Sequence, residues 1–258
     1  MFIRDRCVTV EVHKLTRIKR ITGQRLQKAW QSIPHVTQFN EADITSLEAL
    51  RKKLNKDHTI EGIKITTLSF LMKATVFVLR EFPLFNSPLD HTGEQLVIKK
   101  YFHIGVAVNT KQGLLVPVIR DVDQKSVIDL SKELMDVSDR ARNKRIKPDE
   151  MKGGTFTISN LGGIGGTYFT PIVNHPEVAI LGISRSKNKQ IDNGKSFVVR
   201  RILPFSLSYD HRVIDGAAGA EFVAKLSMVL RDPTSFDNCC LLYTSDAAYE
   251  GLGVDLVG

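Results

Sequence analysis

Cysteine and tryptophan are scarce in this chain of 258 residues, which has three cysteines and one tryptophan. Cys7 stands near one end, and Cys239 and Cys240 are adjacent near the other. This spacing fits neither a disulfide framework nor a recognisable metal site. We therefore expect no metal centre and a reducing compartment.

Long apolar runs are also missing. No run approaches the roughly 20 residues that a membrane span needs, and the first residues, MFIRDRCVTVEV, lack a signal-peptide core. Hydrophobic residues make up 42% of the chain and charged residues 25%, which is ordinary for a soluble globular protein. With no internal repeat and no long linker, we expect one cytoplasmic domain and no membrane contact.

Positive charge is in moderate excess, with 36 lysines and arginines against 28 acidic residues and a net charge of +8. The basic residues are spread along the chain and cluster only in short runs such as residues 17–20. We find no zinc-finger spacing and no interleaved aromatic and basic stripe. The sequence therefore predicts no nucleic-acid partner, and we attribute the charge to anionic ligands such as phosphorylated cofactors.

Hydrophobic periodicity predicts a mixture of helices and strands. Thr45 and Glu48 have the spacing of a capping box at the start of the second helix. A turn is predicted at residues 111–113, between two strand-like runs. Because helices and strands do not alternate regularly, we expect a mixed-sheet α/β (α+β) sandwich in one domain. Helices are predicted over residues 15–32, 46–55, 67–82, 127–146 and 217–230, and strands over residues 35–44, 95–110, 114–122, 155–159, 178–183, 196–203 and 203–209.

The stretch SYDHRVIDG, residues 208–216, places His211 and Asp215 four residues apart at a predicted strand-to-helix junction. A histidine beside an aspartate is usually a surface or hydrogen-bonded polar residue, but packing alone does not require this cluster of titratable groups after an apolar strand. Imidazole titrates near neutral pH and can take a proton from a thiol or hydroxyl and return it. His211 is therefore a candidate general base.

Ser159 ends another predicted strand and is followed by the glycine-rich run NLGGIGG, residues 160–166. The spacing matches neither the dinucleotide-binding nor the P-loop fingerprint. A serine before residues without side chains can present its hydroxyl where another group approaches closely. On this pattern alone, the alternative that Ser159 only makes a turn stays open.

Four segments together resemble the catalytic core of the dihydrolipoyl acyltransferases, the central components of 2-oxo-acid dehydrogenase complexes. The resemblance extends in the correct order from Val8 to Asp232. IPHVT and the following LEALRKKLN are most similar to the acetyltransferases of bacterial pyruvate dehydrogenase complexes. The segments are IPHVTQFNEADIT (33–45), GTFTISNLGGIGGTYFTPIVN (154–174), PEVAILGI (176–183) and SYDHRVIDG (208–216).

The resemblance implies a fold like that of chloramphenicol acetyltransferase and a homotrimer whose active sites lie between subunits, with the histidine and the serine from different chains. It further implies a cage of about 24 subunits, and as partners a lipoyl domain and the pyruvate dehydrogenase and dihydrolipoamide dehydrogenase components. The expected reaction moves an acetyl group between dihydrolipoyl and coenzyme A thiols.

Carried over by this resemblance, His211 is the general base, Ser159 donates to the oxyanion, and Asp215 is a supporting carboxylate. Asp215 could face His211 or pair with a basic residue such as Arg17. Arg51 and Lys52 are expected to meet the phosphates of coenzyme A, which is a substrate here.

Several alternatives stay open. A serine hydrolase would use Ser159, His211 and Asp215, but no G-x-S-x-G elbow surrounds the serine. The others are an inactive structural core, a free-standing acetyltransferase for a small hydroxylated molecule, and succinyl or branched-chain specificity.

The ends of the chain depart from the family pattern. No lipoyl domain precedes the core, so we expect either a fragment or a lipoyl group carried on another protein. We assign residues 1–238 to the catalytic domain. Residues 239–258 form a tail outside the family pattern, either disordered or a sequencing artefact, because CLLYTSDAA (240–248) resembles translated adapter sequence.

Overall fold

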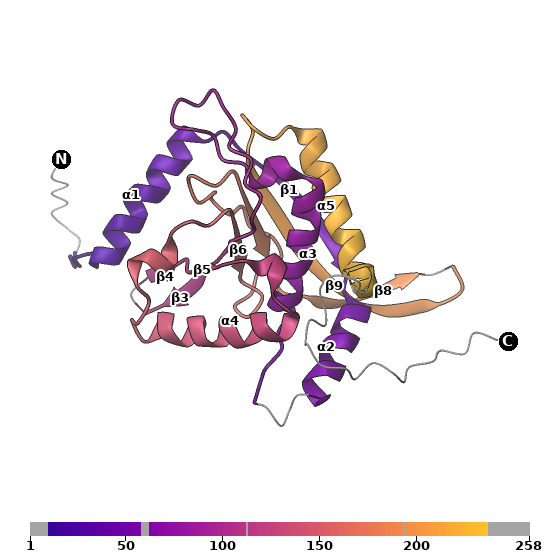
Figure 1. Ribbon diagram of the computed structural model, residues 1–258. Helices are drawn as coiled ribbons and strands as arrows, with labels where there is room; N and C mark the ends of the chain where they lie inside the picture. The colour runs from indigo at the N-terminus through magenta and orange to yellow at the C-terminus, as the bar shows by residue number, and fades with distance from the viewer. Residues whose placement is uncertain (1–9, 58–61, 112, 193, 237–258) are drawn as a thin grey trace.

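A computed structural model describes residues 10–57, 62–111, 113–192 and 194–236 (Figure 1). The predicted tail at residues 239–258 and all three cysteines lie outside the described residues, as does Gln112 of the predicted turn. No helix in the described part of the chain is both long and apolar enough to span a membrane.

A seven-stranded mixed sheet organises the molecule, with its main strands in the order β1-β9-β7-β6-β2-β5 and β8 paired to β9. β6 runs parallel to β2 and β7, whereas the other pairings are antiparallel. β3 and β4 form a separate hairpin. The strands are β1 (His35–Asp43), β2 (Ile104–Val106), β3 (Val108–Thr110), β4 (Gly113–Leu115), β5 (Val118–Ile119), β6 (Phe156–Asn160), β7 (Ala179–Ile183), β8 (Lys187–Asp192) and β9 (Phe197–Asp210).

Two neighbouring helices, α3 and α5, cover one face of the sheet (Figure 1). The sheet residues on this face are large and apolar, including Phe156, Leu181 and Tyr209, all of them fully buried. Their burial supplies the main hydrophobic core. The α-helices are α1 (Arg17–Ser32), α2 (Thr45–Asp57), α3 (Thr67–Glu81), α4 (Val127–Arg142) and α5 (Gly216–Arg231), and the 3-10 helices are η2 (Pro83–Asn86), η3 (Val122–Gln124), η4 (Pro148–Met151) and η5 (Pro233–Phe236).

The opposite face of the sheet is mostly polar, and the segment 161–178 covers part of it. One row of paired residues across the sheet runs Thr37, Ser208, Ile180 and Thr157, and the next includes Ser206, Gly182 and Ser159. Ser206 Oγ donates to the carbonyl of Phe169 at 2.6 Å. Gly182 is required because a Cβ there would lie 2.8 Å from the Phe169 ring.

Most predicted elements are confirmed, with differences that have physical reasons. Residues 197–210 form one continuous strand through Pro204, whose carbonyl still accepts a hydrogen bond from Ser184 N–H. Residues 95–101 contain only an isolated bridge at Leu96 instead of a strand. The predicted capping box of Thr45 and Glu48 is wrong, because the Asp43 carboxylate accepts from the Thr45 backbone and hydroxyl.

Candidate active site

Ser159 lies near the carboxyl end of β6 and is partly buried. It pairs with Gly182 on β7, which pairs with Ser206 on β9. Within the part of the chain that the structure describes, no side chain or backbone group is hydrogen-bonded to its hydroxyl. The hydroxyl is therefore available to a ligand at the point where the glycine-rich segment begins.

His211 lies in the turn that follows β9, and its imidazole is exposed. The turn is fixed by the His211 backbone N–H, which donates to the Pro34 carbonyl at 3.0 Å. Next to it, the buried Asp210 carboxylate accepts two-pronged hydrogen bonds from Arg212, the shortest at 2.6 Å. Such a bidentate pair restricts the turn, and it raises the pKa of Arg212.

The serine and the histidine of one chain lie at opposite ends of the sheet. His211 is five residues beyond Ser206 along β9, and Ser206 is two strands away from Ser159. At about 3.3 Å per residue and about 4.8 Å between strands, their Cα atoms are roughly 19 Å apart. This separation excludes direct contact between the two side chains of a single chain.

Asp215 is the N-cap residue of α5, and its carboxylate accepts a hydrogen bond from the Ala218 N–H at 2.8 Å. An acidic side chain is favourable at a helix N-terminus because it meets unpaired N–H groups. Asp215 therefore starts the helix that follows the His211 turn.

A cavity of about 870 Å³ opens beside the residues that follow Ser159. Its lining combines hydroxyl groups with the cations Arg185, Lys187 and Arg201, and Thr66 and Thr67 from the start of α3, whose N-terminus carries a partial positive charge. The hydroxyl of Ser184 on its wall is buried and has no partner among the described residues. This chemistry suits an anionic ligand.

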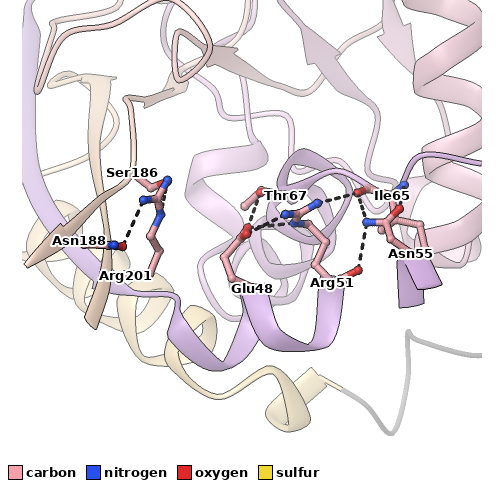
Figure 2. Close-up of polar contacts among 8 residues, drawn as sticks. All are labelled: Glu48, Arg51, Asn55, Ile65, Thr67, Ser186, Asn188 and Arg201. Carbon is pink, nitrogen blue, oxygen red and sulfur yellow. Dashed lines mark hydrogen bonds and ion pairs between the residues drawn. The ribbon is translucent and has the colours of Figure 1, made fainter. Parts of the chain in front are cut away.

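Arg51 and Lys52 lie on α2, and neither of them lines this cavity. The Arg51 guanidinium donates to both oxygens of Glu48 at 3.1 and 2.9 Å and to the Ile65 carbonyl, while Thr67 also donates to Glu48 (Figure 2). Burial would raise the pKa of Glu48, but the hydrogen bonds from Arg51 and Thr67 hold it below its ordinary value. Arg51 is thus bound within the chain, and Lys52 is exposed.

Arg201 lines the cavity together with Ser186 and Asn188, and it donates to Ser186 at 3.0 Å and to Asn188 at 3.2 Å (Figure 2). The sequence analysis did not predict these cavity-lining residues. A signal was present in SRSKNK, residues 184–189, where cations follow a buried strand.

A second cavity of about 700 Å³ borders the first, and both are lined by Thr66, Leu68, Asn160 and Gly163. Its wall is more apolar and includes Val106, Val108, Leu134 and Met135. Asn160, which directly follows Ser159, lines both cavities, whereas Ser159 lines neither, because successive side chains of β6 face opposite sides of the sheet.

Comparison with known proteins identifies the family. The model for the 2-oxoacid dehydrogenases acyltransferase catalytic domain matches residues 8–236. This chain belongs to that family. The dihydrolipoyllysine-residue acetyltransferase component of the pyruvate dehydrogenase complex of Cupriavidus necator is 53% identical over 223 residues. The match covers 86% of this chain and 40% of the relative, so the chain spans less than half the length of this curated relative.

Solved structures of family members confirm the fold prediction. The dihydrolipoamide acetyltransferase of Azotobacter vinelandii superposes with a TM-score of 0.89 at 48% identity, covering 92% of this chain and 97% of that one. A structure of the cubic core of the pyruvate dehydrogenase multienzyme complex matches equally well. Chloramphenicol acetyltransferase shares the fold, with a TM-score of 0.53 at 16% identity over 80% of this chain and 94% of that one.

The Azotobacter structure was described for the role of three residues in the catalytic mechanism. They are a serine, a histidine 52 residues later and an asparagine four residues after that. In this chain Ser159, His211 and Asp215 have the same spacing. Aspartate thus stands where that enzyme has asparagine.

Proposed function

We propose that this chain transfers an acetyl group between a dihydrolipoyl thiol and coenzyme A. The observation that carries the proposal is the shared spacing of Ser159, His211 and Asp215 with the three residues studied in the Azotobacter enzyme, in a chain 48% identical to it. Because the curated relatives are named as components of the pyruvate dehydrogenase complex, the proposed partners are a lipoyl domain and the pyruvate dehydrogenase and dihydrolipoamide dehydrogenase components.

In the proposed mechanism, His211 takes the proton from the thiol of coenzyme A, because a thiol with a pKa near 8.5 is a poor nucleophile until it is deprotonated. The thiolate sulfur attacks the thioester carbonyl of the acetyl-dihydrolipoyl group. The carbon–sulfur bond to the dihydrolipoyl group then breaks, and its sulfur takes the proton back from the imidazolium.

The tetrahedral intermediate carries a negatively charged oxygen. We assign the Ser159 hydroxyl as the hydrogen-bond donor to this oxygen. Loss of one such donor lowers kcat by about 10²–10³ in comparable sites. Because the acyl group passes directly between two thiols, no acyl-serine forms.

The larger cavity is the proposed site for the phosphates of coenzyme A. Its supports are Arg185, Lys187 and Arg201, together with the start of α3 and the unpartnered Ser184 hydroxyl. Lys52 of α2 is exposed and does not line this cavity, so its expected contact with the phosphates stays part of the proposal. Arg51 would first have to exchange its bonds to Glu48 for bonds to phosphate. The bordering apolar cavity would take the aliphatic part of a substrate.

Because the serine and the histidine of one chain are roughly 19 Å apart by register, we propose that each active site combines Ser159 of one subunit with His211 of a partner in a homotrimer. The position four residues after the histidine is a helix N-cap here, so Asp215 supports the site by fixing the start of α5.

The test measures acetyl transfer between acetyl-coenzyme A and free dihydrolipoamide. We expect His211→Ala to abolish most turnover, and Ser159→Ala to lower kcat roughly a hundredfold while KM for coenzyme A changes little. Unchanged turnover in either variant removes that residue from the mechanism. Burst acylation of the protein by an activated ester, without a thiol acceptor, would instead support a serine hydrolase.

The same assay decides the acyl specificity. We expect acetyl-coenzyme A to give a higher kcat/KM than succinyl- or isobutyryl-coenzyme A. A preference for either bulkier group would overturn the acetyl assignment and leave the acyltransferase assignment standing.

A further inference from the structure

Glu177 is a buried carboxylate that lines neither of the two cavities described above. It lies just before β7, and only 5% of its surface is exposed. Burying a carboxylate is unfavourable unless hydrogen bonds compensate for the lost water. An apolar or amide side chain would fill the same space at a lower free-energy cost, so the position calls for an explanation beyond packing.

The carboxylate is held from two elements. Its Oε2 accepts from the Thr157 hydroxyl of β6 at 2.5 Å, and its Oε1 accepts from the Asn174 amide at 3.0 Å. The positive charge of Lys99 stabilises the ionised form of this carboxylate. Gly154 completes the cradle, because a Cβ at that position would lie 2.8 Å from Oε1. The surroundings are therefore fitted closely to a carboxyl group at this place.

These contacts connect the two candidate catalytic strands. Thr157 is two residues before Ser159, so both side chains lie on the same face of β6. The residue after Glu177 is Val178, whose carbonyl accepts the Asp210 N–H at 2.8 Å, one residue before His211. The Glu177 side chain thus fixes the strand of the serine, and the main chain next to it fixes the turn of the histidine.

We propose that Glu177 is a positioning residue for the transfer reaction, which holds β6 through Thr157 and thereby sets the place of the Ser159 hydroxyl. This role rests on the proposed function. A displacement of about 1 Å in a reacting or stabilising group can cost up to a hundredfold in rate.

The first measurement compares kcat and KM of three variants at a temperature well below unfolding. We expect Glu177→Ala and Thr157→Val to lower kcat about tenfold or more, with KM for coenzyme A nearly unchanged. Glu177→Gln keeps an acceptor for Asn174 and can donate to Thr157, so its kcat stays within about threefold of wild type. Glu221→Gln, on the exposed surface of α5, is the matched control with unchanged kcat.

The second measurement is a double-mutant cycle with Ser159→Ala. If Glu177 acts through the serine, Glu177→Ala has little further effect on kcat once the serine hydroxyl is gone. If Glu177→Ala reduces kcat equally in both backgrounds, the positioning role is overturned. Should Glu177→Ala fail to fold, the cycle is run with Thr157→Val, which removes only the hydroxyl donor.

The outcomes separate this proposal from the proposed function. An active wild type whose kcat is unaffected by Glu177→Ala and Thr157→Val overturns the positioning role alone. A wild type without thiol-to-thiol transfer overturns the proposed function and, with it, this role.

Discussion

Glu177 also makes the stability of the molecule depend on pH. Burial raises the pKa of its carboxyl to about 7, although the hydrogen bonds from Thr157 and Asn174 and the charge of Lys99 oppose the shift. An ordinary glutamate in the unfolded chain has a pKa near 4.5. The folded chain therefore binds this proton more tightly than the unfolded chain does.

Linkage fixes the sign of the effect. Below pH about 4.5 both states are protonated at Glu177, and as the pH rises through about 7 the folded state loses about 3 kcal/mol from this group. We expect Glu177→Gln, which cannot ionise, to lack this loss. Urea unfolding of both proteins at pH 5 to 8 measures the difference in unfolding free energy, and a difference that does not change with pH contradicts the prediction.

For single residues, the sequence motifs identified the candidate site side chains but did not predict the hydrogen bonds that these side chains make. Asp215 could be found from its spacing to His211, but its hydrogen bond to Ala218 depends on where α5 begins. Arg51 could be found as a cation on a helix, whereas its pairing with Glu48 also requires Thr67 from the next helix. Glu177 was not predicted as a functional residue, because nothing in PEVAILGI indicates that its glutamate is buried.

At the scale of single elements, the helix α5 contains a glycine that its packing requires. A Cβ on Gly219 would lie 2.8 Å from the ring and hydroxyl of Tyr209, which is fully buried. Alanine gains about 1 kcal/mol over glycine in a helix, but overpacking a rigid core costs about 1–3 kcal/mol. We expect Gly219→Ala to destabilise the protein by about 1 kcal/mol, measured by urea unfolding.

Gly23 is the matched control, because it also lies inside a helix, α1, and nothing is within 4 Å of an added Cβ. Here the helix preference acts alone, so Gly23→Ala should raise the unfolding free energy by up to about 1 kcal/mol. Equal stabilisation by both substitutions would contradict the prediction, because it would show that the Tyr209 side chain makes room for the added methyl group without a loss of unfolding free energy.

Elements with one buried face could be predicted, and elements without one could not. α3 follows from its apolar sequence, and ten of its residues are buried. β8 has six residues that are all exposed, so it shows no alternation and was missed. α1 was predicted from its apolar side, but Ile21, Leu26 and Trp30 on that side stay exposed within this chain. Periodicity predicted the helix without indicating what it packs against.

At the scale of the whole molecule, the distance between Ser159 and His211 predicts complementation between inactive chains. In a trimer with shared sites, a chain carrying Ser159→Ala still offers its histidine, and a chain carrying His211→Ala still offers its serine. Random mixing gives about a quarter of all sites an intact pair, and about a third of the sites in trimers that contain both variants. We expect co-expressed variants, purified through two different tags, to regain activity far above either variant alone.

The controls are the same tagged pairs made from one variant only, which should show no gain. Activity of the mixed assembly equal to the average of the separate variants would contradict sites shared between chains. The sheet order that separates the two residues joins strands distant in sequence, so spacing along the chain could not predict it.

The polar face of the sheet has a consequence for the order of folding. The face under α3 and α5 buries large apolar side chains, and such burial drives early collapse. The other face presents hydroxyl groups and Gly182, and segment 161–178 is fixed to it largely by hydrogen bonds, with a small apolar cluster around Val173 and Ile180. We therefore expect this segment to reach its native structure after the helical side has formed. The surroundings of Ser159 are then the last part of the chain to fold.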